Sequence, residues 1–282
     1  MTLAARASLG WEASLALEFS ARATRSVLTH RAHHGPLRVQ KPFYPETDGT
    51  CHIYLLHPPG GVVGGDALQI DLTLHLGAQA LLTTPAATKF YRSNERYAAQ
   101  TLRAQVADGA SLEWLPQETI VFDGAWARNR TRVELARDAR FIGWEIVCLG
   151  STVKHETFAR GAWQQRLEIW REGTPLFIDR SDVHGNAAVL TQAWGWSGYS
   201  VSGMLACAAA DVPRELVQTL RASCAELQRD GVFAATQLRG VLVCRYLGHH
   251  AQYARACLQR AWEIMRPAAL GKAAQVPRIW NT

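Results

Sequence analysis

A strict alternation of apolar and polar residues constrains the fold of this chain most strongly. From Leu68 to Leu76, a leucine or isoleucine stands at every second position, with polar residues between. Successive side chains of a strand point to opposite faces, so this segment predicts a half-buried strand with one apolar face. Similar alternation occurs at 15–19, 101–106, 112–115, 131–135 and 166–170. Short Pro-, Gly- and Asp-containing turns separate these segments, and the chain is therefore predicted to be mainly β.

A weak internal repeat adds to this pattern. Gly77–Leu81 resembles Gly109–Glu113, and a poorer third copy starts at about residue 138. A period near 30 residues with strands in each copy favours stacked β-layers, as in a solenoid or β-helix, although an ordinary β-sandwich could produce the same similarity.

The pattern changes near residue 210, where apolar residues begin to recur at helical spacing. The first helix is expected at about 211–229, with Asp211 as N-cap and Pro213 in the first turn. A strand at 241–247 follows, and then a second helix at about 251–266 that Pro267 should end. No linker interrupts the sequence, so we expect one domain over residues 1–282, β-rich from 11 to 205, with two helices in its C-terminal third.

Composition excludes several classes of protein. The net charge is +6, but the basic residues are scattered and mostly Arg, which favours acidic protein partners over nucleic acid. The six cysteines form no CxxC pair, and neither a signal peptide nor an apolar run long enough to span a membrane is visible. We therefore expect a cytoplasmic protein with free thiols that binds neither nucleic acid nor membranes.

The glycine-rich loop at 60–65 superficially suggests a phosphate-binding loop. A Walker loop requires Lys and Ser or Thr after its last glycine, whereas Asp66 and Ala67 stand here, and a strand follows in place of a helix. The loop is therefore expected to be a tight turn that allows close approach of backbone or ligand. Asp66 is either a carboxylate that caps this turn or a ligand that faces a cavity.

Two further carboxylates stand in apolar surroundings. Glu145 interrupts the apolar strand 141–149, and Asp179 ends the segment 175–179. An unpaired buried carboxylate costs several kcal/mol, so each either pairs with an Arg or lines a wet channel. An all-β hydrolase or carbohydrate-active enzyme, with Asp66 and Glu145 as its paired carboxylates, is the alternative function.

Four segments together resemble one known family. They are LLHPPGGVVGGDALQIDLTLHLGAQALLTTPAATKFYRS (Leu55–Ser93), WLPQETIVFDGA (Trp114–Ala125), GWEIVCLG (Gly143–Gly150) and VPRIWNT (Val276–Thr282). In content and order they are similar to the urease accessory proteins called UreD or UreH. The resemblance implies a β-helical fold with two helices and a role as a non-enzymatic maturation factor. Such a scaffold would bind apo-urease and two accessory proteins, UreF and the GTPase UreG, and would help conduct nickel to the urease active site.

The resemblance also suggests roles for individual residues. The resemblance implies no tightly bound cofactor, only nickel in transit. Nickel that passes through would meet exchangeable oxygen ligands, and the residues that match the family at such positions are Asp66, Thr88, Glu145 and Asp179. Tyr, Trp and Arg commonly anchor protein contacts, which suggests partner-binding roles for Tyr91, Arg92, Arg278 and Trp280. The chain departs from the family pattern at Ser151, where an arginine is common, and this leaves any fixed arginine partner of Glu145 in doubt.

Overall fold

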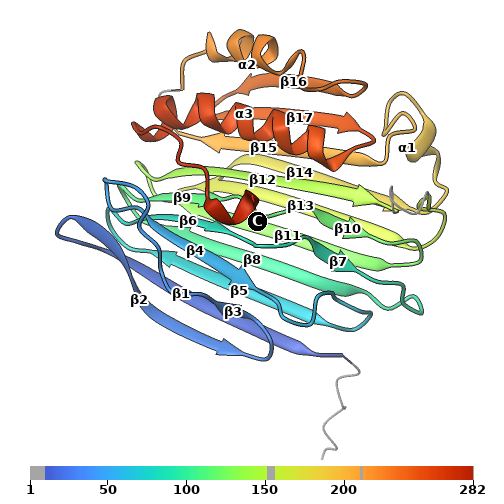
Figure 1. The fold of residues 1–282 in the computed structure, drawn as a ribbon, viewed down its shortest axis with the longest axis horizontal. Coiled ribbons are helices and arrows are strands. Elements are labelled where there is room, and N and C mark those ends of the chain that lie inside the picture. The colour runs from blue at the N-terminus through green and yellow to red at the C-terminus, as the bar shows by residue number, and fades with distance from the viewer. Residues whose placement is uncertain (1–9, 151–155, 210–211, 282) are drawn as a thin grey trace, which may run out of the picture.

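Two β-sheets packed face to face make up most of the protein (Figure 1). The computed structural model describes residues 10–150, 156–209 and 212–281. The seven-stranded sheet has the order β14 (Thr174–His184), β13 (Ala162–Arg171), β11 (Trp126–Leu135), β8 (Ala98–Val106), β5 (Ala67–Leu74), β1 (Glu12–Arg22), β2 (Arg25–His34).

The ten-stranded sheet lies against it. Its main order is β16 (Val232–Leu238), β17 (Val241–Gly248), β15 (Val201–Ala208), β12 (Arg140–Leu149), β9 (Ser111–Trp114), β6 (Gln79–Thr83), β4 (Cys51–Leu56), β3 (Arg38–Val39). The short strands β7 (Thr88–Phe90) and β10 (Thr119–Val121) pair beside β12.

Parallel coils connect the two sheets. The chain passes from β5 through β6 to β7, then from β8 through β9 to β10, and each coil lies beside the previous one in parallel register. The repeated turns bond to each other, since Gly77 N–H donates to the Asp108 carbonyl at 3.0 Å and Asp138 N–H donates to the Asp108 carboxylate at 3.2 Å. The predicted stack of β-layers is confirmed.

Two hydrophobic cores result from this arrangement. The first fills the space between the sheets and contains the inward leucines and isoleucine of β5. The second lies between the outer face of the ten-stranded sheet and two helices, α2 (Leu216–Cys224) and α3 (Ala251–Leu270). In Figure 1, α3 crosses in front of β15 and β17. Strand β12 is buried on both faces, which explains its nearly continuous apolar sequence.

Some predicted boundaries were wrong. β5 ends at Leu74, and Leu76 is 73% exposed because the chain turns at Gly77 with φ of +67°. Pro267 does not end α3, which continues to Leu270, where Gly271 takes a left-handed conformation and donates its N–H to the Pro267 carbonyl. Met265, Ala269 and Leu270 are buried against the second core, and their packing outweighs the cost of about 3 kcal/mol for an internal proline.

Other helical segments also differ from expectation. α2 is shorter than 211–229 because tight turns flank it on both sides. The positions of Asp211, the predicted N-cap, and Ser151 fall outside the described residues. A short helix α1 (Ala188–Thr191) precedes β15, and the C-terminal tail includes a 3-10 turn, η1 (Arg278–Asn281); neither had a clear periodic signal.

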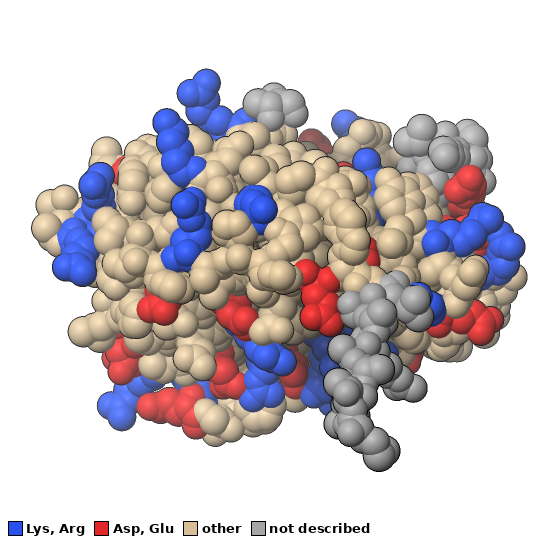
Figure 2. Space-filling model, turned by 90° about the horizontal axis from the view of Figure 1, so that it is seen from below, with Lys and Arg blue, Asp and Glu red and all other residues tan. Residues whose placement is uncertain are grey.

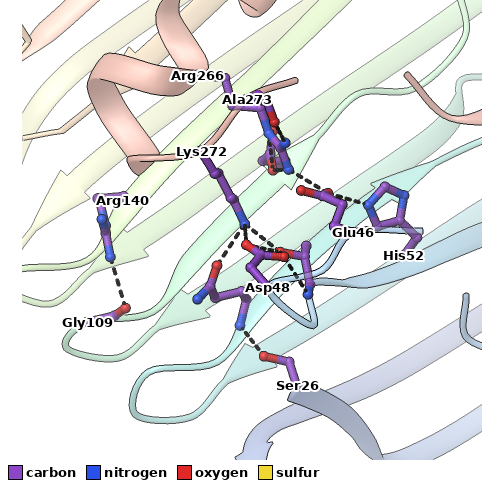
Figure 3. A network of polar contacts seen from close by, with 12 residues as sticks. Ser26, Glu46, Asp48, His52, Gly109, Arg140, Arg266, Lys272 and Ala273 are labelled. Atoms are coloured by element: carbon purple, nitrogen blue, oxygen red, sulfur yellow. Dashed lines mark hydrogen bonds and ion pairs between the residues drawn. The ribbon is translucent and has the colours of Figure 1, made fainter. Parts of the chain in front are cut away.

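A buried network of charges fixes α3 to the ten-stranded sheet (Figure 3). Arg266 of α3 donates to Glu113 of β9 at 2.9 Å and to Glu46 at 2.6 Å, and all three side chains are at least 93% buried. His52 Nε2 lies 2.6 Å from the same Glu46 oxygen, and Trp262 Nε1 donates to Glu113 at 2.7 Å. Burial works against ionisation of Glu46, but the contacts with His52 and Arg266 outweigh it and lower the pKa of that carboxyl.

Candidate functional site

A cavity of about 450 Å³ enters the space between the two sheets. Exposed residues of two loops, among them Pro58, Gly60 and Ala86, form its mouth. Its inner wall includes the buried side chains of Leu68, Asn129 and Glu145. The cavity is therefore mostly apolar at its walls, with a few polar groups at its inner end.

The glycine-rich loop shapes the rim of this mouth. A Cβ atom on Gly61 would lie only 2.0 Å from the ring of Tyr91, so the absence of a side chain allows that ring to pack on the loop. Tyr91 stacks on Phe122 with ring centroids 5.2 Å apart and remains 41% exposed. The neighbouring Arg92 is also exposed and lies 4.0 Å from Asp123. Tyr91 and Arg92 thus form a solvent-facing rim beside the cavity.

Glu145 projects from β12 into the inter-sheet space and meets neutral donors. Thr131 Oγ1 donates to Glu145 Oε1 at 2.7 Å, Asn129 Nδ2 donates to the same oxygen at 3.3 Å, and Gln165 Nε2 donates to Oε2. Within the described part of the chain, no Lys or Arg reaches ion-pair distance of this carboxylate. The site therefore holds a buried carboxylate without a positive charge beside it.

The protonation of Glu145 reflects this environment. The pKa of Glu145 is raised from 4.5 to about 7, chiefly by burial; the negative charge of Asp179 also raises it, and the Thr131, Gln165 and Asn129 hydrogen bonds lower it. Near neutral pH the carboxyl is consequently divided between its charged and neutral forms. A cation that entered the cavity would favour release of the proton.

Asp179 lies at the edge of the seven-stranded sheet, beyond Glu145. It accepts a hydrogen bond from Arg245 of β17, so this ion pair joins the two sheets. In the ten-stranded sheet, Glu145, Met204 and Arg245 stand in register on three neighbouring strands. The Asp179–Arg245 pair is thus about two strand spacings, roughly 10 Å, from Glu145.

Replacing Arg245 with methionine should raise the pKa of Glu145, because Asp179 would then act on it without a nearby compensating cation. The Asp179→Asn variant should lower the same pKa. Both shifts can be followed by NMR titration of side-chain carboxyl carbons, with Glu145→Gln to assign the signal. Shifts in the same direction for both variants would contradict this account of the electrostatics.

The other two residues that the sequence suggested as oxygen ligands for nickel, Thr88 and Asp66, lie in different places. Thr88 lines the cavity near its mouth. Asp66 accepts hydrogen bonds from the backbone N–H groups of Trp11 at 2.8 Å and Val63 at 3.0 Å, so it caps the glycine-rich turn. It is close enough to His57 on the cavity wall for its charge to oppose the lowering of the His57 pKa by burial. Glu145 and Thr88 therefore share the cavity, whereas Asp66 and Asp179 do not line it.

These placements bear on the alternative function. A hydrolase with Asp66 and Glu145 as its paired carboxylates requires both in one open groove. Asp66 does not belong to the cavity wall that contains Glu145, and its two carboxylate oxygens are already bonded to backbone. The geometry does not favour this alternative.

The two predicted contact residues near the C-terminus lie elsewhere, over the outer face of the ten-stranded sheet. Trp280 is half-buried, packs against Trp144 and Trp262, and donates its indole N–H to Thr83 at 2.8 Å. Arg278 is exposed beside it. Trp280 therefore stabilises the second core, and any contact that it makes with a partner would use only its exposed edge.

Other features of the surface and interior limit what the site can hold. The described residues contain no cluster of three or more His, Cys, Asp or Glu side chains arranged to hold a metal ion. All six cysteines are buried free thiols. Among the described helices, none has the length and hydropathy needed to cross a membrane. Viewed from the side on which β1 and β2 lie (Figure 2), basic side chains occur at separate places, and acidic side chains lie among them mainly in the lower half of the view.

Several residues of the site were not identified from the sequence. Asn129 and Thr131 occupy inward positions of β11 where apolar residues would be expected, so the alternation itself contained this signal. Gln165 and Arg245 gave no such signal, because their relation to Glu145 and Asp179 depends on how the two sheets face each other.

Comparison with known proteins identifies the family. The model of the UreD urease accessory protein family matches residues 12–281. A urease accessory protein UreD of Dechloromonas aromatica is 44% identical over 276 residues, covering 98% of this chain and 96% of that protein. A UreD protein of Azoarcus sp. is 45% identical, and the match covers 97% of this chain and 95% of that protein. UreD 2 of Brucella anthropi is 44% identical, and the match covers 98% of this chain and 100% of that protein. These relatives are named accessory proteins and not enzymes. The chain belongs to the UreD family of urease accessory proteins, and its role lies in urease maturation.

Proposed function

We propose that this chain is a scaffold through which nickel reaches apo-urease, in a cytoplasmic complex with UreF-like and UreG-like accessory proteins. The observation that carries the proposal is Glu145, a buried carboxylate on the wall of a cavity that opens to solvent, whose hydrogen-bond donors among the described residues are all neutral. A buried anion without an adjacent cation is electrostatically suited to receive a positive ion.

The ligand chemistry is that of passage and not of storage. Carboxylate, hydroxyl and amide oxygens bind Ni²⁺ more weakly than a Cys/His cage would, so the ion can leave again. Thr88 near the mouth and Glu145 deeper in the cavity would provide successive oxygen contacts, directly or through water. Asp66 and Asp179 would contribute their charge, since each already has hydrogen-bond partners in the protein.

The proposed proton balance follows from the pKa of Glu145. With that pKa raised to about 7, the carboxyl holds a proton part of the time when the cavity contains no ion. An arriving Ni²⁺ would displace the proton, and its departure would allow the carboxyl to take up a proton again. The site would thereby avoid a permanent unpaired charge inside the protein.

The rim suggests where a partner delivers the ion. Tyr91 and Arg92 are exposed next to the mouth, and these residue types are frequent at the centre of protein interfaces. We propose that an accessory protein binds there and covers the mouth, and that Arg278 and the exposed edge of Trp280 belong to a second contact. The buried free thiols suit a reducing cytoplasm.

The test uses Glu145→Gln in the full complex. The variant keeps the shape of the side chain but loses its charge, so tagged chain should still co-purify with apo-urease and the accessory proteins. Urease activation with nickel and GTP should fall at least about tenfold, the effect of losing roughly 1.4 kcal/mol of interaction with the ion. Glu134→Gln, on the outer face of β11, is the matched control and should activate normally.

Two results would contradict the proposal in different ways. Normal activation by Glu145→Gln with intact assembly would show that the carboxylate does not act on nickel. Failure of the unmodified chain to co-purify with apo-urease or the accessory proteins would remove the scaffold role itself.

A further inference from the structure

The outer face of the seven-stranded sheet has a cationic centre. Arg130 of β11, Arg166 of β13 and Arg180 of β14 stand directly beside each other in the strand register. We call these three residues the arginine row. Neighbouring strands lie about 4.8 Å apart, so the row extends over roughly 10 Å. Arg130 and Arg180 are exposed, and the Arg166 side chain is 37% exposed.

Within the described residues, the row is only partly neutralised. Arg166 forms a 2.5 Å ion pair with Glu168, and Glu168 also lies 3.9 Å from Arg132. The Nε atom of Arg166 is buried and has no hydrogen-bond partner in the described structure. Across residues 10–150, 156–209 and 212–281, neither Arg130 nor Arg180 has an ion pair or a side-chain hydrogen bond. Like charges directly opposite each other on neighbouring strands destabilise a sheet. The repulsion that Arg130 and Arg180 exert on Arg166 is therefore a cost to folding that only the Arg166–Glu168 ion pair offsets among the described residues.

The outer face of the same sheet also carries carboxylates, and three of them are already occupied. Asp71 accepts from Gln69 at 2.6 Å, Glu134 pairs with Arg132 at 2.5 Å, and Asp182 accepts from Gln164 at 3.2 Å. A long polyanion laid across this face would meet these carboxylates on either side of the arginines. A short acidic segment would be confined to the centre, where its charge is complementary.

We propose that the arginine row docks an acidic segment of a protein partner through Asp or Glu side chains. The planar guanidinium group donates two parallel hydrogen bonds to a carboxylate, so three neighbouring arginines can bind two or three carboxylates. Acidic residues at positions i and i+2 of an extended segment are about 7 Å apart. Acidic residues at positions i and i+4 of a helix are about 6 Å apart. Both spacings fit within the length of the row. This surface is separate from the cavity, and the proposal does not depend on nickel transfer.

The experiment measures binding of a fluorescein-labelled oligo-glutamate peptide to the full chain by fluorescence anisotropy. The Arg130→Glu/Arg180→Glu variant should raise the Kd at least about tenfold, because two attractive contacts become repulsive. The matched control, Arg214→Glu/Arg239→Glu, makes the same change of charge at exposed positions outside this sheet face and should change the Kd less than about twofold. Binding to the unmodified chain should weaken as salt is raised from about 50 to 300 mM.

Three outcomes would overturn the proposal. They are absence of peptide binding at low salt, equal loss of binding in the control variant, and tighter binding of a nucleic-acid oligonucleotide of the same charge that also depends on the row. Thermal unfolding separates docking from a structural role, since relief of repulsion should leave the Tm of the row variant unchanged or higher. If the charge-reversed chain does not fold, Arg130→Gln/Arg180→Gln must fold and still weaken peptide binding.

Discussion

Replacing Arg266 with alanine should remove about 3–5 kcal/mol from the free energy of unfolding. The substitution would leave Glu113 and Glu46 buried without their shared cation, and it would also leave a cavity under α3. Because domains are stable by only about 5–15 kcal/mol, this one change should bring the chain close to unfolding. Urea denaturation followed by tryptophan fluorescence would measure it, since Trp262 and Trp280 both pack in the same core.

The same helix contains a control for this prediction. Arg260 pairs with Glu263 at 3.5 Å on the surface, and Arg260→Ala should cost less than about 1 kcal/mol. Combining Arg266→Met with Glu113→Gln and Glu46→Gln removes all three charges and should recover much of the lost stability. Equal losses in Arg266→Ala and Arg260→Ala would show that the buried network does not hold α3 in place.

Glu145→Gln should change how stability depends on pH. Between about pH 4.5 and 7, the folded chain keeps a proton on Glu145 that the unfolded chain releases, because burial raises the folded pKa to about 7. The stabilisation from this group is therefore complete below pH 4.5 and is lost as the pH rises through 7. The free energy of unfolding of the unmodified chain, relative to Glu145→Gln, should fall by about 3 kcal/mol over this range.

Urea unfolding of both chains at a series of pH values would test this expectation. Taking the difference removes the contribution of other titrating groups that the substitution leaves unchanged. Glu134→Gln, at an exposed ion pair, should change relative stability by less than about 1 kcal/mol over the same range. A constant difference between Glu145→Gln and the unmodified chain would mean that burial does not perturb Glu145.

The stacked sheets could be predicted because their signal is local. Alternation along β5, and turn glycines at the start of each repeated segment, specify a strand face and a coil length without knowledge of distant contacts. Local signals also placed α2 and α3 correctly in the sequence. The end of α3 could not be predicted from Pro267, because the packing of Ala269 and Leu270 against the second core decides it.

The candidate site was only partly visible in the sequence, for a similar reason. Glu145 could be singled out because a carboxylate is expensive in an apolar strand. Its hydrogen-bond donors, and the ion pair of Asp179 with Arg245, come from strands that meet only when the two sheets face each other. The Arg266–Glu113 pair joins residues 153 positions apart, and no periodicity connects them.

A stack of parallel coils has no natural end, since each coil exposes an edge that could receive another. In this chain antiparallel strands close the stack at both ends, through β2 beside β1 and through β15 and β17 beside β12. The free edge at β2 carries His30, Arg31, His33 and His34 in exposed positions. Such an edge opposes strand addition, so copies of this protein should resist joining edge to edge into fibres.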